Sequence, residues 1–133
     1  MECYYDIVAV YDDALDLEIL MRALRNTSYR IKCFEDTDEA LSHLISDKPR
    51  FLIVDYQMCT TDGVAFITQL SGLMDINAIN ICLTSGGRVP ADVVAQAHQL
   101  NTHVLLKDEI FAKGYLAKLC AGEIDWTTLE FAA

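Results

Sequence analysis

The sequence has few basic residues and no long apolar run. Lys and Arg together number 10 against 20 Asp and Glu, so the formal net charge is −10. Phosphate backbones and anionic lipid surfaces repel a domain of this charge, and we expect neither nucleic acid nor a membrane as a direct partner. No apolar run approaches the ~20 residues that a membrane-spanning helix needs. The charge favours a cation, or a neutral or basic protein surface, as the partner.

The sequence also lacks the marks of export and of a disulfide framework. Residues 1–6 are acidic, without the basic start and apolar core of a signal peptide. The cysteines are odd in number and lack Cys-x-x-Cys spacing; they are Cys3, Cys33, Cys59, Cys82 and Cys120. Free, mostly buried thiols in a reducing compartment are the simplest interpretation. We therefore expect a soluble cytoplasmic domain.

What is present suffices for one domain. The chain has 133 residues, of which 53% are hydrophobic and 23% charged, a globular composition. We place the domain at residues 1–121 and treat residues 122–133 as a C-terminal tail or the start of a linker. Because the tail holds Trp126 and Phe131, it could pack on the domain, form a homodimer contact or begin a linker helix.

Short apolar runs rich in β-branched residues predict five strands. Residues 51–54 are all apolar, which is typical of a strand buried on both faces of a sheet, and Asp55 stands at the carboxyl end of this run. Lys32 interrupts the second run and makes it the weakest. The predicted strands are residues 7–10, 30–34, 51–54, 80–84 and 103–106.

Five helices are predicted from apolar residues spaced three and four apart. Their apolar stripes are Leu17, Leu20, Met21 and Leu24; Ala40, Leu41, Leu44 and Ile45; Phe66, Ile67 and Leu70; Val93, Val94, Ala97 and Leu100; and Phe111, Leu116 and Leu119. Strands that alternate with helices pair in parallel, and right-handed crossovers leave few topologies. We expect an α/β fold with a doubly wound, five-stranded parallel sheet in the order 2-1-3-4-5 and helices on both faces.

Polar side chains follow four of the predicted strands. Asp12 and Asp13 follow the first strand, Asp55 ends the third, Thr84 ends the fourth, and Lys107 follows the fifth. The carboxyl ends of parallel strands share one edge of the sheet, where ligands bind. Each residue alone is commonly a turn or cap residue. Their coincidence at one edge predicts a functional site.

The chemistry of these residues suits the transfer of a phosphoryl group. The three carboxylates repel one another unless a cation neutralises them. Mg²⁺ suits best because it takes oxygen ligands and needs only one or two carboxylates plus a phosphate oxygen, while Ca²⁺ is an alternative. One carboxylate could then attack phosphorus. Lys107 and the Thr84 hydroxyl could each hold an oxygen of the transferred group.

With these segments the sequence resembles the receiver domains of two-component response regulators, over about residues 5–119. The similar segments are Val10-Tyr11-Asp12-Asp13, Glu39-Ala40-Leu41, Ile53-Val54-Asp55, Met58 with Asp62-Gly63, Leu83-Thr84-Ser85 and Leu105-Leu106-Lys107. The resemblance implies a flavodoxin-like fold that accepts a phosphoryl group from a histidine kinase or a histidine phosphotransfer protein. It also implies a switch surface formed by the fourth helix, fifth strand and fifth helix, roughly residues 90–119.

The resemblance assigns a role to each candidate metal ligand. Asp55 would accept the phosphoryl group and also bind Mg²⁺. Asp13 would bind the ion directly, whereas Asp12 would act mainly through water. The backbone carbonyl of Gln57 would complete the protein ligands.

The resemblance also defines a switch and three departures from the usual pattern. Lys107 would contact the phosphoryl group, and Thr84 would move toward it. The family's usual aromatic residue that moves with this threonine is replaced by Val104. The proline that commonly follows the lysine is Asp108, which predicts either a strained cis bond or a reshaped loop. Cys59 replaces a common proline and could expose a thiol.

Three functions are open at this point. The first is a phosphorylation switch whose catalysis is limited to its own phosphorylation and dephosphorylation. The second is a pseudo-receiver, a protein-interaction module that signals without phosphate, although the complete set of candidate site residues argues against it. The third is a phosphatase or phosphotransferase that turns over an outside substrate. Such an enzyme would need a general acid two residues beyond Asp55, and Gln57 cannot serve.

Overall fold

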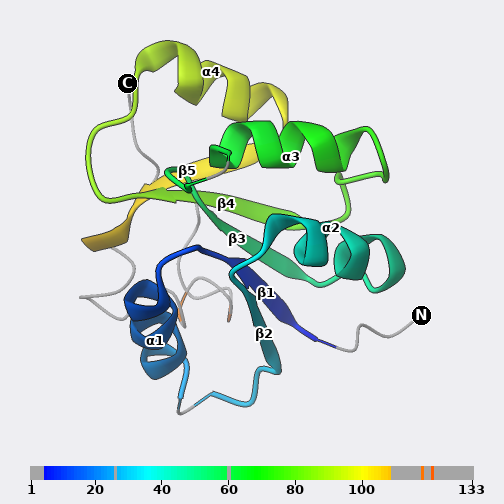
Figure 1. The fold of residues 1–133 in the computed structure, drawn as a ribbon, viewed down its shortest axis with the longest axis vertical. Helices are drawn as coiled ribbons and strands as arrows, with labels where there is room; N and C mark the ends of the chain where they lie inside the picture. The colour runs from blue at the N-terminus through cyan, green and yellow to red at the C-terminus, as the bar shows by residue number, and fades with distance from the viewer. Residues whose placement is uncertain (1–4, 26, 60, 109–117, 119–120, 122–133) are drawn as a thin grey trace.

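The computed structural model describes residues 5–25, 27–59, 61–108, 118 and 121. Strands and helices alternate along this part of the chain: β1 (Ile7–Val10), α1 (Ala14–Ala23), β2 (Ile31–Phe34), α2 (Thr37–Ser46), β3 (Phe51–Asp55), α3 (Gly63–Ser71), β4 (Asn80–Ser85), α4 (Ala91–Gln99) and β5 (Thr102–Leu106). The strands form one parallel sheet in the order β2-β1-β3-β4-β5 (Figure 1), which confirms the predicted topology. The predicted fifth helix, with Phe111, Leu116 and Leu119, lies outside the described residues.

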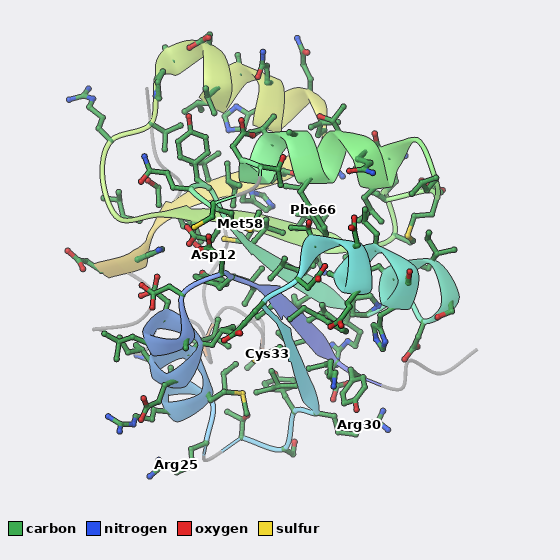
Figure 2. The ribbon with its side chains drawn as sticks, viewed as in Figure 1. Asp12, Arg25, Arg30, Cys33, Met58 and Phe66 are labelled. Carbon is green, nitrogen blue, oxygen red and sulfur yellow. The ribbon has the colours of Figure 1, made fainter. Side chains whose placement is uncertain are left out.

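The described helices lie on both faces of the sheet. Helix α1 packs on one face, whereas α2, α3 and α4 lie together on the other (Figure 1). Phe66 of α3 points into the larger of the two apolar layers (Figure 2). Successive strand residues face opposite layers, as Ile53 and Val54 of β3 do. Because both faces are covered, every residue of β1 and β3 is buried, as the uninterrupted apolar run predicts. Among the described residues, no helix is both long and apolar enough to cross a bilayer.

The strand limits differ from the predicted ones by a single residue in four places. β2 begins at Ile31, β3 extends to Asp55, β4 extends to Ser85, and β5 begins at Thr102. Arg30 falls outside β2 because its backbone bonds to the segment before β1. Its carbonyl accepts from the N–H of Asp6 at 2.8 Å, and its own N–H donates to the Asp6 carboxylate at 2.9 Å.

Two predicted core residues of the helices are exposed. Met21 of α1 is 43% exposed and Ile45 of α2 is 51% exposed, whereas the other residues predicted for these two stripes are buried. At about 100° per residue, Met21 and Ile45 lie roughly 70° and 90° from the centres of their stripes. The helices therefore bury narrower faces than the sequence predicts.

Gly63 brings helix α3 close to the strand that ends in Asp55. A Cβ atom at this position would lie 2.6 Å from the backbone oxygen of Asp55 and would also overlap the side chain of Leu83. Backbone cannot yield as a flexible side chain can, so any larger residue forces α3 and the end of β3 apart. The glycine is required for its small size.

We expect Gly63→Ala to lower the free energy of unfolding by about 1–3 kcal/mol, the usual cost of forcing an extra group into a packed interior. Denaturant unfolding measures this change. Gly72→Ala at the other end of α3 is the matched control, because its Cβ would approach nothing closer than 3.5 Å. Equal stability of the two variants would contradict the close approach.

Candidate functional site

The carboxylate of Asp55 lies at the carboxyl edge of the sheet, almost fully buried. Asp55 is the last residue of β3 and is paired in register with Thr84 of β4. The residue is 3% exposed. One carboxylate oxygen, Oδ1, accepts a hydrogen bond from the backbone N–H of Gln57 at 3.3 Å. The same oxygen lies 3.2 Å from the ammonium nitrogen of Lys107.

Lys107 connects β5 to the start of α1. Its Nζ donates to Oδ2 of Asp16 at 2.6 Å, in addition to the ion pair with Asp55. The same Nζ lies 5.3 Å from the centroid of the Tyr11 ring, within cation–π range. The predicted approach of Lys107 to Asp55 is thus present in the structure, and the contact with Asp16 is an addition that the sequence analysis did not anticipate.

Burial and pairing act in opposite directions at this ion pair. Burial lowers the pKa of Lys107, but the hydrogen bond to Asp16 and the charge of Asp55 outweigh it, so the pKa is raised. Burial raises the pKa of Asp55, and the opposing effect of Lys107 does not cancel it. The raised pKa favours the charged form of Lys107 but disfavours the charged form of Asp55. Lys107 faces two carboxylates, whereas Asp55 shares its one ammonium with Asp16.

The two carboxylates that follow β1 hold the adjoining loop and helix. Oδ2 of Asp12 accepts a short hydrogen bond from the backbone N–H of Cys59, in the loop that follows β3. Figure 2 shows Asp12 beside this loop, near Met58. Hydrogen bonding from Cys59 is the main reason that the pKa of Asp12 is lowered. Asp13 is exposed and caps α1, its Oδ1 accepting from the N–H of Leu15 at 2.9 Å.

Thr84 lies on β4 beside Asp55 and is fully buried. Its hydroxyl makes a short hydrogen bond with the hydroxyl of Tyr11, and a longer one of 3.4 Å to the carbonyl of Val54. Tyr11, also fully buried, stands directly after β1. Burial is the main reason that the pKa of Tyr11 is raised well above its usual value, so its hydroxyl keeps its proton.

The sequence implies a Mg²⁺ ion held by Asp12, Asp13, Asp55 and the backbone carbonyl of Gln57. Asp12, Asp13 and the Gln57 carbonyl offer only oxygen, the ligand type that Mg²⁺ prefers. Within the described residues, however, no three His, Cys, Asp or Glu side chains form a group that could hold a metal. The donors fit the ion in kind; one oxygen of Asp12 accepts from the N–H of Cys59, and one oxygen of Asp55 is paired with Lys107.

Gln57 lies in a loop that folds back on itself. It forms an isolated antiparallel bridge with Asp62, and the N–H of Gly63 donates to the carbonyl of Tyr56 at 2.8 Å. Asp62 caps α3 by accepting from the N–H of Ala65 at 2.7 Å. The loop therefore holds Gln57 just beyond Asp55.

The expected departures from the family pattern have mixed outcomes. Val104 is fully buried in the core. No peptide bond between described residues is cis, so of the two alternatives predicted at Lys107 and Asp108 the strained cis bond is not the one adopted. Cys59 is exposed, as its place in the loop predicts. A hydrogen bond with the Asp12 side chain and its negative charge raise the pKa of the Cys59 thiol, which disfavours the reactive thiolate.

Sequence analysis missed Tyr11 and Asp16 as members of the site. Tyr11 lies between β1 and the two carboxylates, and no pattern in the sequence marks it as a partner of Thr84. Asp16 lies in the first turn of α1, where an acidic residue is commonly explained by the helix dipole. The available signal for Asp16 was its position three residues after Asp13, which places both near the same end of one helix.

Comparison with known proteins agrees with this geometry. The sequence matches the response regulator receiver domain family over residues 7–118. The chain therefore belongs to this family, and it is a receiver domain of two-component signalling. It is 36% identical over 69 residues to the response regulator MprA of Mycobacterium tuberculosis, a match that covers 52% of this chain. The match covers 30% of MprA, well under two thirds of that protein's length.

Solved structures share the fold at low sequence identity. The chemotaxis protein CheY4 of Vibrio cholerae has a TM-score of 0.72 and 17% identity, over 85% of this chain and 93% of that one. A response regulator protein from Burkholderia pseudomallei, solved with a phosphorylated aspartic acid, a calcium ion and citrate, has a TM-score of 0.65 and 19% identity. That match covers 88% of this chain and 71% of the Burkholderia chain. These likenesses show a CheY-like fold.

Proposed function

We propose that the domain is a phosphorylation switch in which Asp55 accepts a phosphoryl group from a phosphohistidine on a histidine kinase or a histidine phosphotransfer protein. The observation that carries this proposal is the 3.2 Å approach of the Lys107 ammonium to a buried carboxylate at the carboxyl edge of a parallel sheet. Thr84 stands beside that carboxylate on the neighbouring strand. A candidate nucleophile, a cationic side chain and a hydroxyl donor thus lie at the carboxyl edge of the sheet.

The proposed transfer uses the carboxylate as the nucleophile. An oxygen of Asp55 attacks phosphorus while the phosphorus–nitrogen bond of the phosphohistidine breaks. The electron pair of that bond stays on the imidazole nitrogen, which takes up a proton, and Asp55 becomes an acyl phosphate. Attack by water on phosphorus then releases inorganic phosphate and restores the carboxylate. Catalysis is limited to the domain's own Asp55.

Each oxygen of the transferred group has a candidate partner. Lys107 has three N–H donors, so it can hold one phosphoryl oxygen and keep its hydrogen bond to Asp16. The Thr84 hydroxyl can donate to a second oxygen. Asp12, Asp13, Asp55 and the Gln57 carbonyl would hold Mg²⁺, which supplies positive charge for the third oxygen when bound.

The proposed output surface lies next to this site. Thr84 pairs with Leu105 of β5, and β5 packs against α4. A shift of Thr84 toward a phosphoryl oxygen would bias the packing of α4 and β5, which belong to the predicted switch surface of residues 90–119. The phosphorylated aspartic acid in the Burkholderia pseudomallei protein supports the same use of Asp55 here. We infer that residues 1–121 form the receiver and that residues 122–133 are a tail or the start of a linker.

Incubation with acetyl phosphate and Mg²⁺ tests the proposal. We expect intact-mass spectrometry to show a gain of one phosphoryl group that is stable in acid and lost in base, as an acyl phosphate should be. Chelation of Mg²⁺ with EDTA should slow labelling by at least about tenfold, and excess Mg²⁺ should restore it. No mass gain with Mg²⁺ present would instead favour a pseudo-receiver, and repeated turnover of an outside phosphate ester would favour an enzyme.

A further inference from the structure

One buried side chain touches both groups that are proposed to hold the phosphoryl oxygens. The hydroxyl of Tyr11 is hydrogen-bonded to the hydroxyl of Thr84, and the face of its ring lies 5.3 Å from Nζ of Lys107. Tyr11 is fully buried, so water does not compete for these contacts. The three residues come from the ends of β1, β4 and β5. The hydrogen bond from Tyr11 to Thr84 therefore joins the ends of β1 and β4, the two strands that flank the strand of Asp55.

The hydrogen-bonding capacity of Thr84 limits how it can contact both Tyr11 and Val54. A threonine hydroxyl has one proton to donate and two lone pairs. The Thr84 proton is directed at the carbonyl of Val54, at a long distance of 3.4 Å. Either hydroxyl can donate the short bond between them, and when the Thr84 proton lies on Val54 the tyrosine is the donor. In this arrangement Tyr11 holds the oxygen of Thr84. The proton of Thr84 is in a weak hydrogen bond, which it can leave for a better acceptor.

We propose that Tyr11 is a positioning residue for phosphorylation: it holds the Thr84 oxygen through its hydroxyl and the Lys107 ammonium against its ring, so that both can meet a phosphoryl group on Asp55. This inference rests on the proposed function. With the oxygen of Thr84 fixed, its proton turns from the Val54 carbonyl to a phosphoryl oxygen. The bond from Tyr11 then polarises the Thr84 hydroxyl and makes it a better donor.

Tyr11→Phe tests the inference because it removes the hydroxyl and keeps the ring. We expect the rate of acetyl phosphate labelling to fall about three- to tenfold, the range that one neutral hydrogen bond supplies. Tyr29→Phe is the matched control, because Tyr29 packs against the same apolar layer but precedes β2, near the opposite edge of the sheet. Its labelling rate should equal that of the wild type.

A double-variant comparison separates positioning from a general structural role. If Tyr11 acts through the Thr84 hydroxyl, Tyr11→Phe should slow a Thr84→Ser protein but should not slow a Thr84→Ala protein further. Thr84→Ala keeps Lys107 and the nucleophile, so its labelling stays measurable. Thermal unfolding of each variant confirms that the assay temperature lies below its transition.

The outcomes separate this inference from the proposed function. A wild-type protein that is labelled, together with a Tyr11→Phe variant labelled at the same rate, overturns the role of Tyr11 alone. Equal slowing by Tyr11→Phe in the wild-type and Thr84→Ala backgrounds also overturns it, since the hydroxyl would then not act through Thr84. A wild-type protein that acquires no phosphoryl group overturns both proposals.

Discussion

Replacement of Asp55 by Asn should slow labelling by acetyl phosphate at least about a thousandfold, because a neutral amide has no carboxylate oxygen to attack phosphorus. The two side chains have nearly the same shape, so the surrounding packing is preserved. Intact-mass spectrometry over time gives the rate of phosphoryl gain. The residual gain in the variant should not exceed that of protein incubated without acetyl phosphate.

The loss of labelling in Asp55→Asn should not come from unfolding. Burial raises the pKa of Asp55, so the ionised carboxylate costs folding free energy at neutral pH. Removal of this charge should therefore raise the thermal midpoint, and differential scanning calorimetry measures the change. Asp92→Asn in the exposed first turn of α4 is the matched control and should be labelled at the wild-type rate. Wild-type labelling of Asp55→Asn would place the phosphoryl group elsewhere.

Replacement of Lys107 by Ala should slow labelling about a hundredfold. The ammonium lies 3.2 Å from Oδ1 of Asp55, so it is placed to neutralise charge as the transfer proceeds. Loss of one such preorganised donor typically costs two to three orders of magnitude in rate. Stopped labelling reactions analysed by mass give the rate.

Two further variants show whether the slower labelling of Lys107→Ala comes from the loss of a positive charge or from the loss of a charge at this position. Lys107→Arg keeps the charge but changes its shape, and we expect its rate to lie between those of the wild type and Lys107→Ala. Lys48→Ala, which removes an exposed lysine from the loop before β3, should leave the rate unchanged. If Lys48→Ala slowed labelling as much as Lys107→Ala, the general charge of the protein would be the cause.

The strand-end residues could be predicted because parallel topology places them together. Once five apolar runs alternate with helical stripes, the carboxyl ends of the strands must share an edge. The juxtaposition of Asp55, Thr84 and Lys107 follows from order along the chain alone. The hydrogen-bond partners of these three residues cannot be predicted from that order, because they depend on how α1 packs beside β1 and on side-chain rotamers.

The contacts of Tyr11 and Asp16 could not be predicted from the order of residues along the chain. The contact of Tyr11 with Thr84 joins residues 73 positions apart, and that of Lys107 with Asp16 joins residues 91 apart. Neither pair follows a spacing rule, since each joins side chains from elements that are far apart in the sequence. The same limit explains Met21, whose helical spacing is correct but whose face of α1 lies beyond the reach of the sheet.

The position of the phosphoryl group tests the central claim most directly. After labelling with acetyl phosphate and Mg²⁺, the protein can be digested in acid and the modified peptide sequenced by tandem mass spectrometry. The account predicts one phosphoryl group, on Asp55, in a peptide that contains the end of β3. A phosphoryl group on any other residue, or none after prolonged incubation of folded protein, would contradict it.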